Sequence, residues 1–239
     1  METQLQKTMV DGVIMKTMGT DSPFNSRAAD YDRWFDEKDG KIIFATEVTA
    51  FQEVLPLLPK PWLEIGVGSG RFAEALRIST GLDPAEKLLE MARGRGIMTL
   101  QGKVDDHILP SESFGTVFLI MTLCFMDNPV IALQEIHHTL KPHGRLALGV
   151  VPAESAWGIA HLQKKQAAHP FYKHANFYTY PQLKSLLKDT GFAMSITIST
   201  LFQQPGHLTG IETPLTDFHR DAGFLVIVAD KIPHPPGMW

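Results

Sequence analysis

The sequence contains very little cysteine and no long apolar stretch. Cys124 is the only cysteine among 239 residues, so no disulfide can form within the chain and nothing points to an oxidising compartment. No stretch reaches the roughly 18 consecutive apolar residues that a membrane-spanning helix needs. Residues 1–19 also lack the apolar core and the cleavage site of a signal peptide. We therefore expect a cytoplasmic protein with no membrane contact.

The sequence also lacks an excess of one charge and any spacing typical of metal ligands. The formal net charge is -4 and charged residues make up 20% of the chain, whereas nucleic-acid-binding domains usually carry clustered lysines and arginines. A nucleic-acid partner is therefore not expected. The chain has 10 histidines, but His137 and His138 are adjacent and would point in different directions from a helix. No H-x3-H or C-x2-C spacing occurs, so we predict no metal site.

What the sequence does contain is a regular alternation of short apolar stretches and amphipathic helical patterns. The stretches with the length and composition of buried strands are WLEIG, STGLD, IMTLQG, SFGTVFLIMTL, RLALGVV, FAMSITISTLF and GFLVIVADK. Continuous apolar strands separated by helices are typical of a parallel sheet that is covered on both faces. The order of the elements predicts a doubly wound α/β fold with a seven-stranded, mostly parallel sheet.

Two segments fall outside this alternation. Residues 152–178 carry many aromatic and basic side chains, and we expect them to form an insertion after the fifth strand, over the carboxyl edge of the sheet on the acceptor side. Residues 1–22 show weak periodicity and end in loop-forming residues. We expect them to be an N-terminal extension, either disordered or the result of a start-site choice. The remaining residues, 23–239, are expected to form a single domain.

Three closely spaced glycines separate the first strand from the helical pattern that follows, in WLEIGVGSGRF. Gly66 can adopt a conformation that lets the chain turn off the strand, and Gly68 lets a ligand approach the backbone. Gly70 lets the helix begin close to the sheet, with its first amides facing the same crevice. The spacing is G-x-G-x-G rather than the G-x-G-x-x-G of dinucleotide-binding proteins, and no G-K-[ST] follows. The loop predicts a site for a flat or anionic small molecule; a purely structural turn is the alternative.

Acidic residues stand at the ends of three neighbouring strands. Glu64 lies two residues before the first glycine, and Asp83 ends the second strand. In an open sheet these strand ends meet at one crevice, where a carboxylate can accept hydrogen bonds from a ribose diol. Asp105 and Asp106 follow the third strand, and a carboxylate or backbone group there could meet an adenine amino group.

Together these motifs resemble the class I S-adenosylmethionine-dependent methyltransferases, of the small-molecule kind known as type 11. LEIGVGSGRF resembles the glycine-rich first motif of the family, and GLDPAEKLLEMARGRG resembles its second. SFGTVFLIMTLCFMDNPVIALQEIHHTLKPHGRLALGV is similar to the fourth strand, the next helix and the fifth strand. The resemblance covers about residues 24–151. It implies a Rossmann-like methyltransferase fold with an antiparallel last strand, and S-adenosylmethionine as cofactor, with S-adenosylhomocysteine as product.

The resemblance also implies roles for individual residues. The glycines would face the methionine end of the cofactor, Asp83 would hold the ribose, and Asp105 or Asp106 would lie by the adenine. RAADYDRWF resembles the N-terminal helix that such enzymes lay over the cofactor, so a helical N-terminal cap is expected, with Tyr31 above the donor. The predicted cofactor-binding residues are Tyr31, Glu64, Gly66, Gly68, Gly70, Asp83, Pro84, Asp105, Asp106 and Thr122. Gly115 departs from the family, which usually has aspartate there.

Candidate acceptor residues come from the N-terminal cap, the end of the fourth strand and the insertion. The predicted substrate contacts are Trp34, Cys124, Phe125, Trp157 and Tyr172. The candidate general bases are His161, His169, Tyr172 and His174, because loops over a site often carry function. Each has a structural alternative: His169 could belong to a turn, Tyr172 could be a core aromatic, and Cys124 could be a small apolar filler.

The function that we expect is direct in-line transfer of a methyl group to a small-molecule nitrogen, oxygen or sulfur nucleophile. An amine or thiol acceptor needs no dedicated base, whereas an oxygen acceptor more often does. A nucleotide-dependent oxidoreductase is disfavoured by the glycine spacing. A non-catalytic, methyltransferase-like protein that binds the cofactor or a partner stays open, because Gly115 departs from the family and no base is evident. We expect a monomer or a homodimer.

Overall fold

The computed structural model describes residues 22–233. The predicted N-terminal extension, apart from Ser22, lies outside the described residues, as does the end of the chain after residue 233. Within the described part, no helix is both long enough and apolar enough to cross a membrane.

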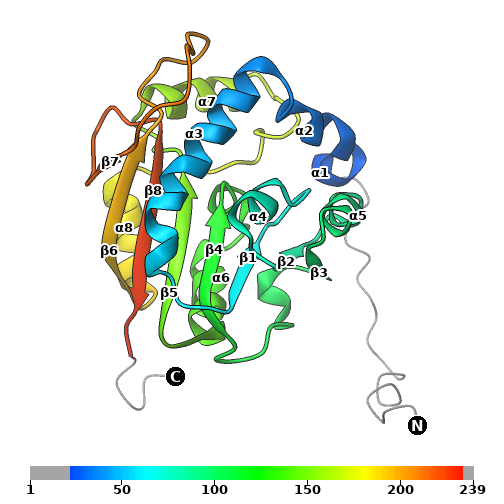
Figure 1. Cartoon of the computed structure of the whole chain (residues 1–239), viewed down its shortest axis with the longest axis vertical. Coiled ribbons are helices and arrows are strands. Elements are labelled where there is room, and N and C mark those ends of the chain that lie inside the picture. Colours follow the sequence, from blue (N-terminus) through cyan, green and yellow to red (C-terminus); the bar gives the residue numbers. More distant parts are fainter. Residues whose placement is uncertain (1–21, 234–239) are drawn as a thin grey trace.

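A single mixed sheet runs through the molecule in the order β3-β2-β1-β4-β5-β8-β6-β7 (Figure 1). Its strands are β1 (Trp62–Ile65), β2 (Thr80–Asp83), β3 (Met98–Gln101), β4 (Phe114–Ile120), β5 (Leu140–Val150), β6 (Phe192–Thr200), β7 (Leu215–Thr216) and β8 (Phe224–Lys231). The first five strands pair in parallel, and β8 lies antiparallel between β5 and β6. The predicted doubly wound, mostly parallel sheet with an antiparallel last strand is confirmed.

Two details of the prediction are wrong. The sheet has eight strands rather than seven, because β7 adds two exposed residues through antiparallel pairing with β6. A segment this short has no periodicity of its own, so only its partner defines it. The sequence NPVIALQEIHHTLKPHG predicts a helix that stops at Pro142–Gly144, whereas the helix in the structure ends at Thr139 and Leu140 is already extended. Pro142 accounts for this, since the residue before a proline is disfavoured in the helical conformation.

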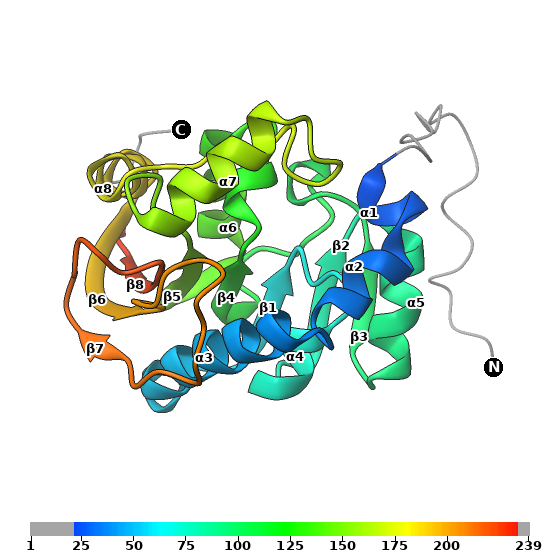
Figure 2. The same cartoon turned by 90° about the horizontal axis from the view of Figure 1, so that it is seen from above.

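The core is divided by the sheet into two layers. Successive side chains of β4 point to opposite faces: Val117 and Leu119 join one apolar cluster, and Phe118 and Ile120 join the other. This alternation is why a parallel strand must be apolar at every position. The helices α3 (Lys38–Val54), α4 (Arg71–Leu76) and α5 (Glu86–Gly94) cover the second face, and α6 (Pro129–Thr139) and α8 (Tyr180–Asp189) cover the first (Figure 2).

Three further helices lie across the end of the sheet at which the parallel strands finish. They are α1 (Pro23–Ser26), α2 (Ala28–Trp34) and α7 (Ala156–Gln166), which lie at the top of Figure 1, beyond the ends of β1 and β4. Seen from above in Figure 2, α7 lies on the side of α6 and α8, and α1 and α2 lie on the side of α5. The expected N-terminal cap is therefore helical. The expected insertion contains α7 and a loop that returns to α8. In open α/β sheets, ligands bind outside this end of the strands.

Candidate active site

The glycine loop joins β1 to α4, and each of its glycines is in the left-handed region, with φ of +74° at Gly66, +53° at Gly68 and +83° at Gly70. The surroundings also require small residues. A Cβ on Gly66 would lie 2.3 Å from the Thr122 side chain at the end of β4, and one on Gly70 would lie 3.0 Å from the Ala92 Cα atom of α5. Gly66 and Gly70 thus permit close packing, while Gly68 is buried with the Tyr31 ring of the cap beside it.

Two buried carboxyl groups lie beside this loop. The Asp83 carboxylate accepts hydrogen bonds from the backbone amides of Gly68 (2.9 Å) and Ala85 (2.8 Å). Burial raises the pKa of Asp83 despite these bonds. Burial, followed by the charge of Asp83, also raises the pKa of Glu64 well above its usual value. Within residues 22–233, the buried Glu64 Oε2 atom has no hydrogen-bond partner. Since buried polar atoms are nearly always paired in folded proteins, this oxygen marks a position for a ligand donor.

The acids after β3 differ in their partners. Asp106 Oδ2 accepts a hydrogen bond from the Lys103 amide at 2.7 Å and closes a single helical turn, Val104–Asp106. Asp105 is exposed, and its carboxylate makes no hydrogen bond within the described part of the chain. The geometry therefore favours Asp105 over Asp106 as the adenine contact. Pro84 is exposed and precedes α5, which begins two residues later.

Tyr31 connects the glycine loop to the cap. A Cβ added to Gly68 would lie 3.5 Å from Cε1 of Tyr31 and 3.6 Å from its hydroxyl oxygen. On its other side the ring packs 5.6 Å from Phe24 and 5.8 Å from Phe171. Burial raises the pKa of the Tyr31 hydroxyl, and the charges of Asp83 and Glu64 are close enough to raise it further. Tyr31 thus lies between the two carboxyl groups and the insertion.

An array of rings continues from Tyr31 across the insertion, and we call it the aromatic cap. Its members are Phe24, Tyr31, Phe125, Phe171, Tyr172 and Phe177. Neighbouring rings are 5.0 Å apart at Phe24 and Phe125, and 6.4 Å apart at Phe125 and Tyr172. The residues come from α1, α2, the turn after β4 and the loop after α7. Packing therefore unites segments that are distant in sequence.

The candidate bases of the insertion occupy different environments. His161 is buried on α7 with its ring 4.6 Å from that of Tyr172, and its Nδ1 donates to the Trp157 carbonyl at 2.9 Å. Burial lowers the pKa of His161 to about 4, so the ring is neutral at pH 7. His169 is half-buried, 5.2 Å from the Tyr172 ring. His174 is exposed, and its prediction as a base receives no support from its position.

The Cys124 thiol lies beside the aromatic cap but is poorly suited to act as a nucleophile. Burial raises its pKa to about 12, so the thiolate is scarce at neutral pH. Its sulfur donates to the Met121 carbonyl at 3.5 Å. These features favour the alternative that Cys124 fills space at the edge of the site.

The two tryptophans predicted to contact substrate are not part of the aromatic cap. Trp157 is buried in the apolar core, and its indole nitrogen donates to the Gln203 carbonyl at 2.7 Å. Packing and hydrogen bonding of this kind favour a structural role, and a substrate contact by Trp157 stays a prediction. Trp34 is 39% exposed and packs edge-on against Phe35, with 5.1 Å between the rings.

Glu47 is a further candidate site residue, and it is not among those predicted from the sequence. It lies on α3, is only 5% exposed, and makes no hydrogen bond or ion pair within residues 22–233. Burial raises its pKa to about 8, and its charge raises the pKa of both Tyr31 and Tyr172. One sequence signal could have found it: Glu47 falls on the apolar stripe of its helix, four residues from Ile43 and four from Phe51.

The N-terminal cap is held to the glycine loop by ion pairs. Asp32 on α2 accepts hydrogen bonds from Arg71, the first residue of α4, at 2.8 Å and 2.9 Å, and from Arg95 at 3.1 Å. Arg95 also donates to the Ser69 carbonyl within the loop at 2.7 Å. Burial opposes ionisation of Asp32, but these arginines keep its pKa well below the usual range. The position of Tyr31 is thereby coupled to the loop.

Gly115 has a local explanation. A Cβ at this position would lie 2.5 Å from the Pro59 carbonyl oxygen and 2.6 Å from that of Lys60, and the Gly115 amide donates to the Pro61 carbonyl at 2.8 Å. The glycine thus permits a close backbone approach at the beginning of β4, at the end of the sheet opposite the glycine loop. The departure from the family at Gly115 therefore does not weigh against cofactor binding.

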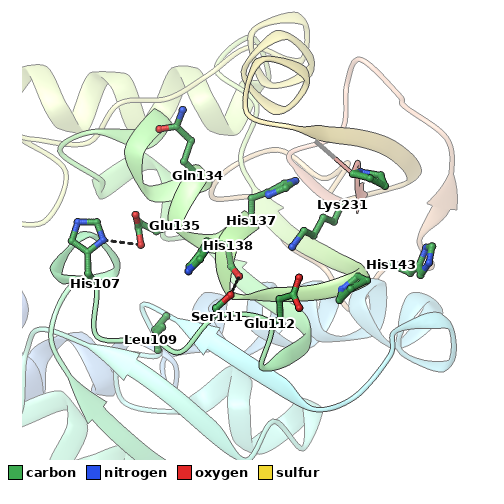
Figure 3. Close-up of a pocket in the computed structure, with 12 residues that line it drawn as sticks. His107, Leu109, Ser111, Glu112, Gln134, Glu135, His137, His138, His143 and Lys231 are labelled. Atoms are coloured by element: carbon green, nitrogen blue, oxygen red, sulfur yellow. Dashed lines mark hydrogen bonds and ion pairs between the residues drawn. The ribbon is translucent and has the colours of Figure 1, made fainter. Parts of the chain in front are cut away.

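A cavity of about 710 Å³ lies at that opposite end, between α6, the beginning of β5 and the end of β8 (Figure 3). Its lining is rich in histidine and includes His107, which pairs with Glu135 at 2.9 Å, and His138. None of the predicted site residues lines it. Within residues 22–233, no group of His, Cys, Asp and Glu is arranged to hold a metal ion.

Comparisons with known proteins identify the family to which the chain is similar. The sequence model of a family described as "Methyltransferase domain" matches residues 63–148. An uncharacterized protein of Mycobacterium tuberculosis is 36% identical over 210 residues, which cover 87% of this chain and 74% of the relative. An uncharacterized protein of Methanocaldococcus jannaschii is 32% identical over 209 residues, covering 87% of this chain and 98% of the relative.

Solved structures show the same fold. A crystal structure from Thermotoga maritima, described as a SAM-dependent methyltransferase and possible histamine N-methyltransferase, is 35% identical, with a TM-score of 0.80. The match covers 87% of this chain and 98% of that one. A Haloferax volcanii protein, described as a putative methyltransferase in complex with the Trm112 methyltransferase activator, is 19% identical with a TM-score of 0.64. The match covers 89% of this chain and 99% of that one. At this low identity it supports only the fold.

Proposed function

The chain belongs to the class I S-adenosylmethionine-dependent methyltransferases, and we propose that its methyl acceptor is a small molecule with a nitrogen, oxygen or sulfur nucleophile. The observation that carries the proposal is the position of Tyr31. Its hydroxyl lies between the two buried carboxyl groups beside the glycine loop and the aromatic cap. A cofactor side and an acceptor side thus meet at one residue.

The residues beside the glycine loop fit the cofactor. Asp83 has lone pairs left to accept ribose hydroxyls after its two backbone hydrogen bonds. The unpartnered Glu64 Oε2 offers a further acceptor, and Asp105 is free to meet the adenine amino group. When bound, S-adenosylmethionine supplies an electrophilic methyl group, and the protein supplies orientation and a site that excludes water.

The aromatic cap supports a small acceptor. Its half-buried rings would pack against an apolar body, and the two together would keep water from the reacting atoms. The Thermotoga maritima relative, described as a possible histamine N-methyltransferase, supports nitrogen as the nucleophile. In-line displacement by a neutral amine needs no strong base, which agrees with the absence of an evident one among the candidates of the insertion.

Two measurements test the proposal. Titration calorimetry should show binding of S-adenosylhomocysteine, and labelled S-adenosylmethionine should transfer its methyl group to at least one member of a panel of amines, phenols and thiols. A protein that binds S-adenosylhomocysteine but methylates no member of a broad panel would support the non-catalytic alternative. A protein that does not bind S-adenosylhomocysteine would contradict the assignment of the glycine loop.

A further inference from the structure

Glu47 and the aromatic cap restrict the acceptor further. We propose that the acceptor is a small amine, and that the Glu47 carboxylate binds its nitrogen and takes up its proton before methyl transfer. This inference rests on the proposed function for the identity of the reaction, but it concerns residues that the cofactor site does not use.

The first argument is that Glu47 is buried without a partner. Its side chain belongs to the interior face of α3, and no donor within residues 22–233 reaches its oxygens. A buried carboxyl group loses the hydrogen bonds that it makes with water, and an unmade hydrogen bond in the interior is costly. A carboxyl group on the apolar face of α3 therefore lowers the stability of the fold, and a ligand that donates an N–H hydrogen bond to it would offset that loss.

The second argument is that other unpaired polar groups lie in the same interior region. The Tyr31 and Tyr172 hydroxyls make no hydrogen bond within the part of the chain that the structure describes. Glu47 acts electrostatically on both, and Tyr172 acts on Tyr31. Glu47 on α3 is thus within electrostatic range of tyrosines from α2 and from the loop after α7, and several polar groups near one position are the expected arrangement around a polar atom of a ligand.

The third argument is the chemistry of the surrounding walls. Around Tyr31 and Tyr172 the aromatic cap presents Phe24, Phe125 and Phe171. Aromatic faces attract cations, and a carboxylate beside them adds a charge-assisted hydrogen bond. An anionic acceptor such as a phenolate or thiolate would be repelled by ionised Glu47, and an alcohol would gain no charge complement.

The other groups that face this region leave Glu47 as its proton acceptor. Burial lowers the pKa of His161 to about 4, so its neutral ring is a much weaker base than Glu47, and the Cys124 thiol stays protonated. Lys164 lies 5.6 Å from the centre of the Tyr172 ring, and burial lowers its pKa. This cation comes from α7, whereas Glu47 comes from α3, and binding of an ammonium group would favour the ionised form of Glu47. An ammonium group would be drawn to Glu47.

The chemistry balances with Glu47 as the proton acceptor. An ammonium nitrogen has no lone pair, so one N–H proton must first pass to a Glu47 oxygen. A C–N bond then forms as the C–S bond breaks with its electron pair left on sulfur, and the positive charge passes to nitrogen. Burial raises the pKa of Glu47 to about 8, which suits a group that gains and loses a proton near neutral pH.

The test measures binding rather than turnover. Protein saturated with S-adenosylhomocysteine is titrated at pH 7 with 2-phenylethylamine, tryptamine, butylamine and imidazol-1-ylpropylamine, each compared with the corresponding alcohol. At least one amine should bind about 10- to 100-fold more tightly than its alcohol, the range for a charge-assisted hydrogen bond. Its binding should release a proton from Glu47, detected as a heat that depends on the ionisation enthalpy of the buffer.

Variants of α3 make the test specific. Glu47→Gln keeps the size of the side chain and should abolish both the preference for the amine and the proton release. Glu47→Asp, which keeps a carboxyl group, should retain the proton release with weaker binding. Glu53→Gln, on an exposed position of the same helix, should change neither. Circular dichroism confirms that each variant is folded.

The outcomes separate the two proposals. The inference is overturned if no amine in the panel is preferred over its alcohol, or if the preference survives in Glu47→Gln. Methylation of a phenol or thiol without any amine preference would overturn it while the proposed function holds. If S-adenosylhomocysteine does not bind, the proposed function fails and with it the role of the amine as methyl acceptor, while the same titration without it still decides whether Glu47 binds an amine.

Discussion

Replacing Glu47 by glutamine should make the unliganded protein more stable, by an amount that grows between pH 5 and pH 8. Burial raises the pKa of this carboxyl group from its usual 4.5 to about 8 in the folded chain. The folded state therefore binds the proton more tightly than the unfolded state. The stability associated with that proton is fully present below pH 4.5 and is lost as the pH rises to about 8.

The magnitude follows from the two pKa values. Across the interval the wild-type protein loses up to about 1.4 kcal/mol per pH unit from this group. Between pH 5 and pH 8 the loss is on the order of 3–4 kcal/mol. This loss is a large fraction of the free energy of unfolding of a typical domain, which is about 5–15 kcal/mol. Glutamine is close in shape and carries no charge, so Glu47→Gln should be nearly free of this dependence.

The assay is urea unfolding at several pH values, followed by the fluorescence of the four tryptophans. Glu64 and Asp83, whose pKa values are also raised by burial, titrate in both proteins and cancel in the difference. The exposed Glu53→Gln variant should show a difference from wild type that does not change with pH. A constant difference between Glu47→Gln and wild type from pH 5 to pH 8 would refute the reasoning.

Three further predictions concern the cofactor side and Cys124. Asp83→Ala should weaken S-adenosylhomocysteine binding by about 1–3 kcal/mol, because ribose hydroxyls would be left unpaired; an unchanged dissociation constant in calorimetry would contradict the ribose contact. Asp32→Asn should weaken the attachment of α2 to Arg71 and Arg95. Hydrogen exchange across the N-terminal cap should then rise, and cofactor affinity should fall about 3- to 10-fold. Exchange equal to wild type would show that the ion pairs do not hold the cap. Cys124→Ala should leave the methylation rate within about threefold, because the thiol stays protonated; a loss of activity in a folded variant would restore Cys124 as a reacting group.

The parts of the fold that sequence could reveal are those encoded by local pattern. The apolar stretches of β1, β4 and β5 identify buried strands because both faces of the sheet are covered. β7 escaped because two exposed residues carry no period, and only pairing with β6 makes them a strand. The early end of α6 was readable from Pro142 but was obscured by the helical pattern before it.

The two sides of the candidate site differ in the same way. Most of the cofactor side comes from one continuous stretch, 64–83, in which a strand, a glycine loop and a second strand fix the positions of their acids, so spacing alone points to that part. The acceptor side combines α1, α2, α3, the turn after β4 and the loop after α7. No spacing rule relates these segments, since their contacts depend on how α3 and the cap cross the end of the sheet.

Glu47 shows why this difference matters for assigning a substrate. On a helical wheel it is one acid among apolar neighbours, and burial without a partner is visible only when the rest of the cap is in place. Glu47 also indicates a role for Tyr31 and Tyr172, because two hydroxyls near one buried carboxyl group form a polar position among aromatic rings. Cofactor identity in such a fold follows from motifs, whereas acceptor identity follows from which polar groups the packing leaves unpaired. Here the carboxyl group among them favours a nitrogen that can give up a proton.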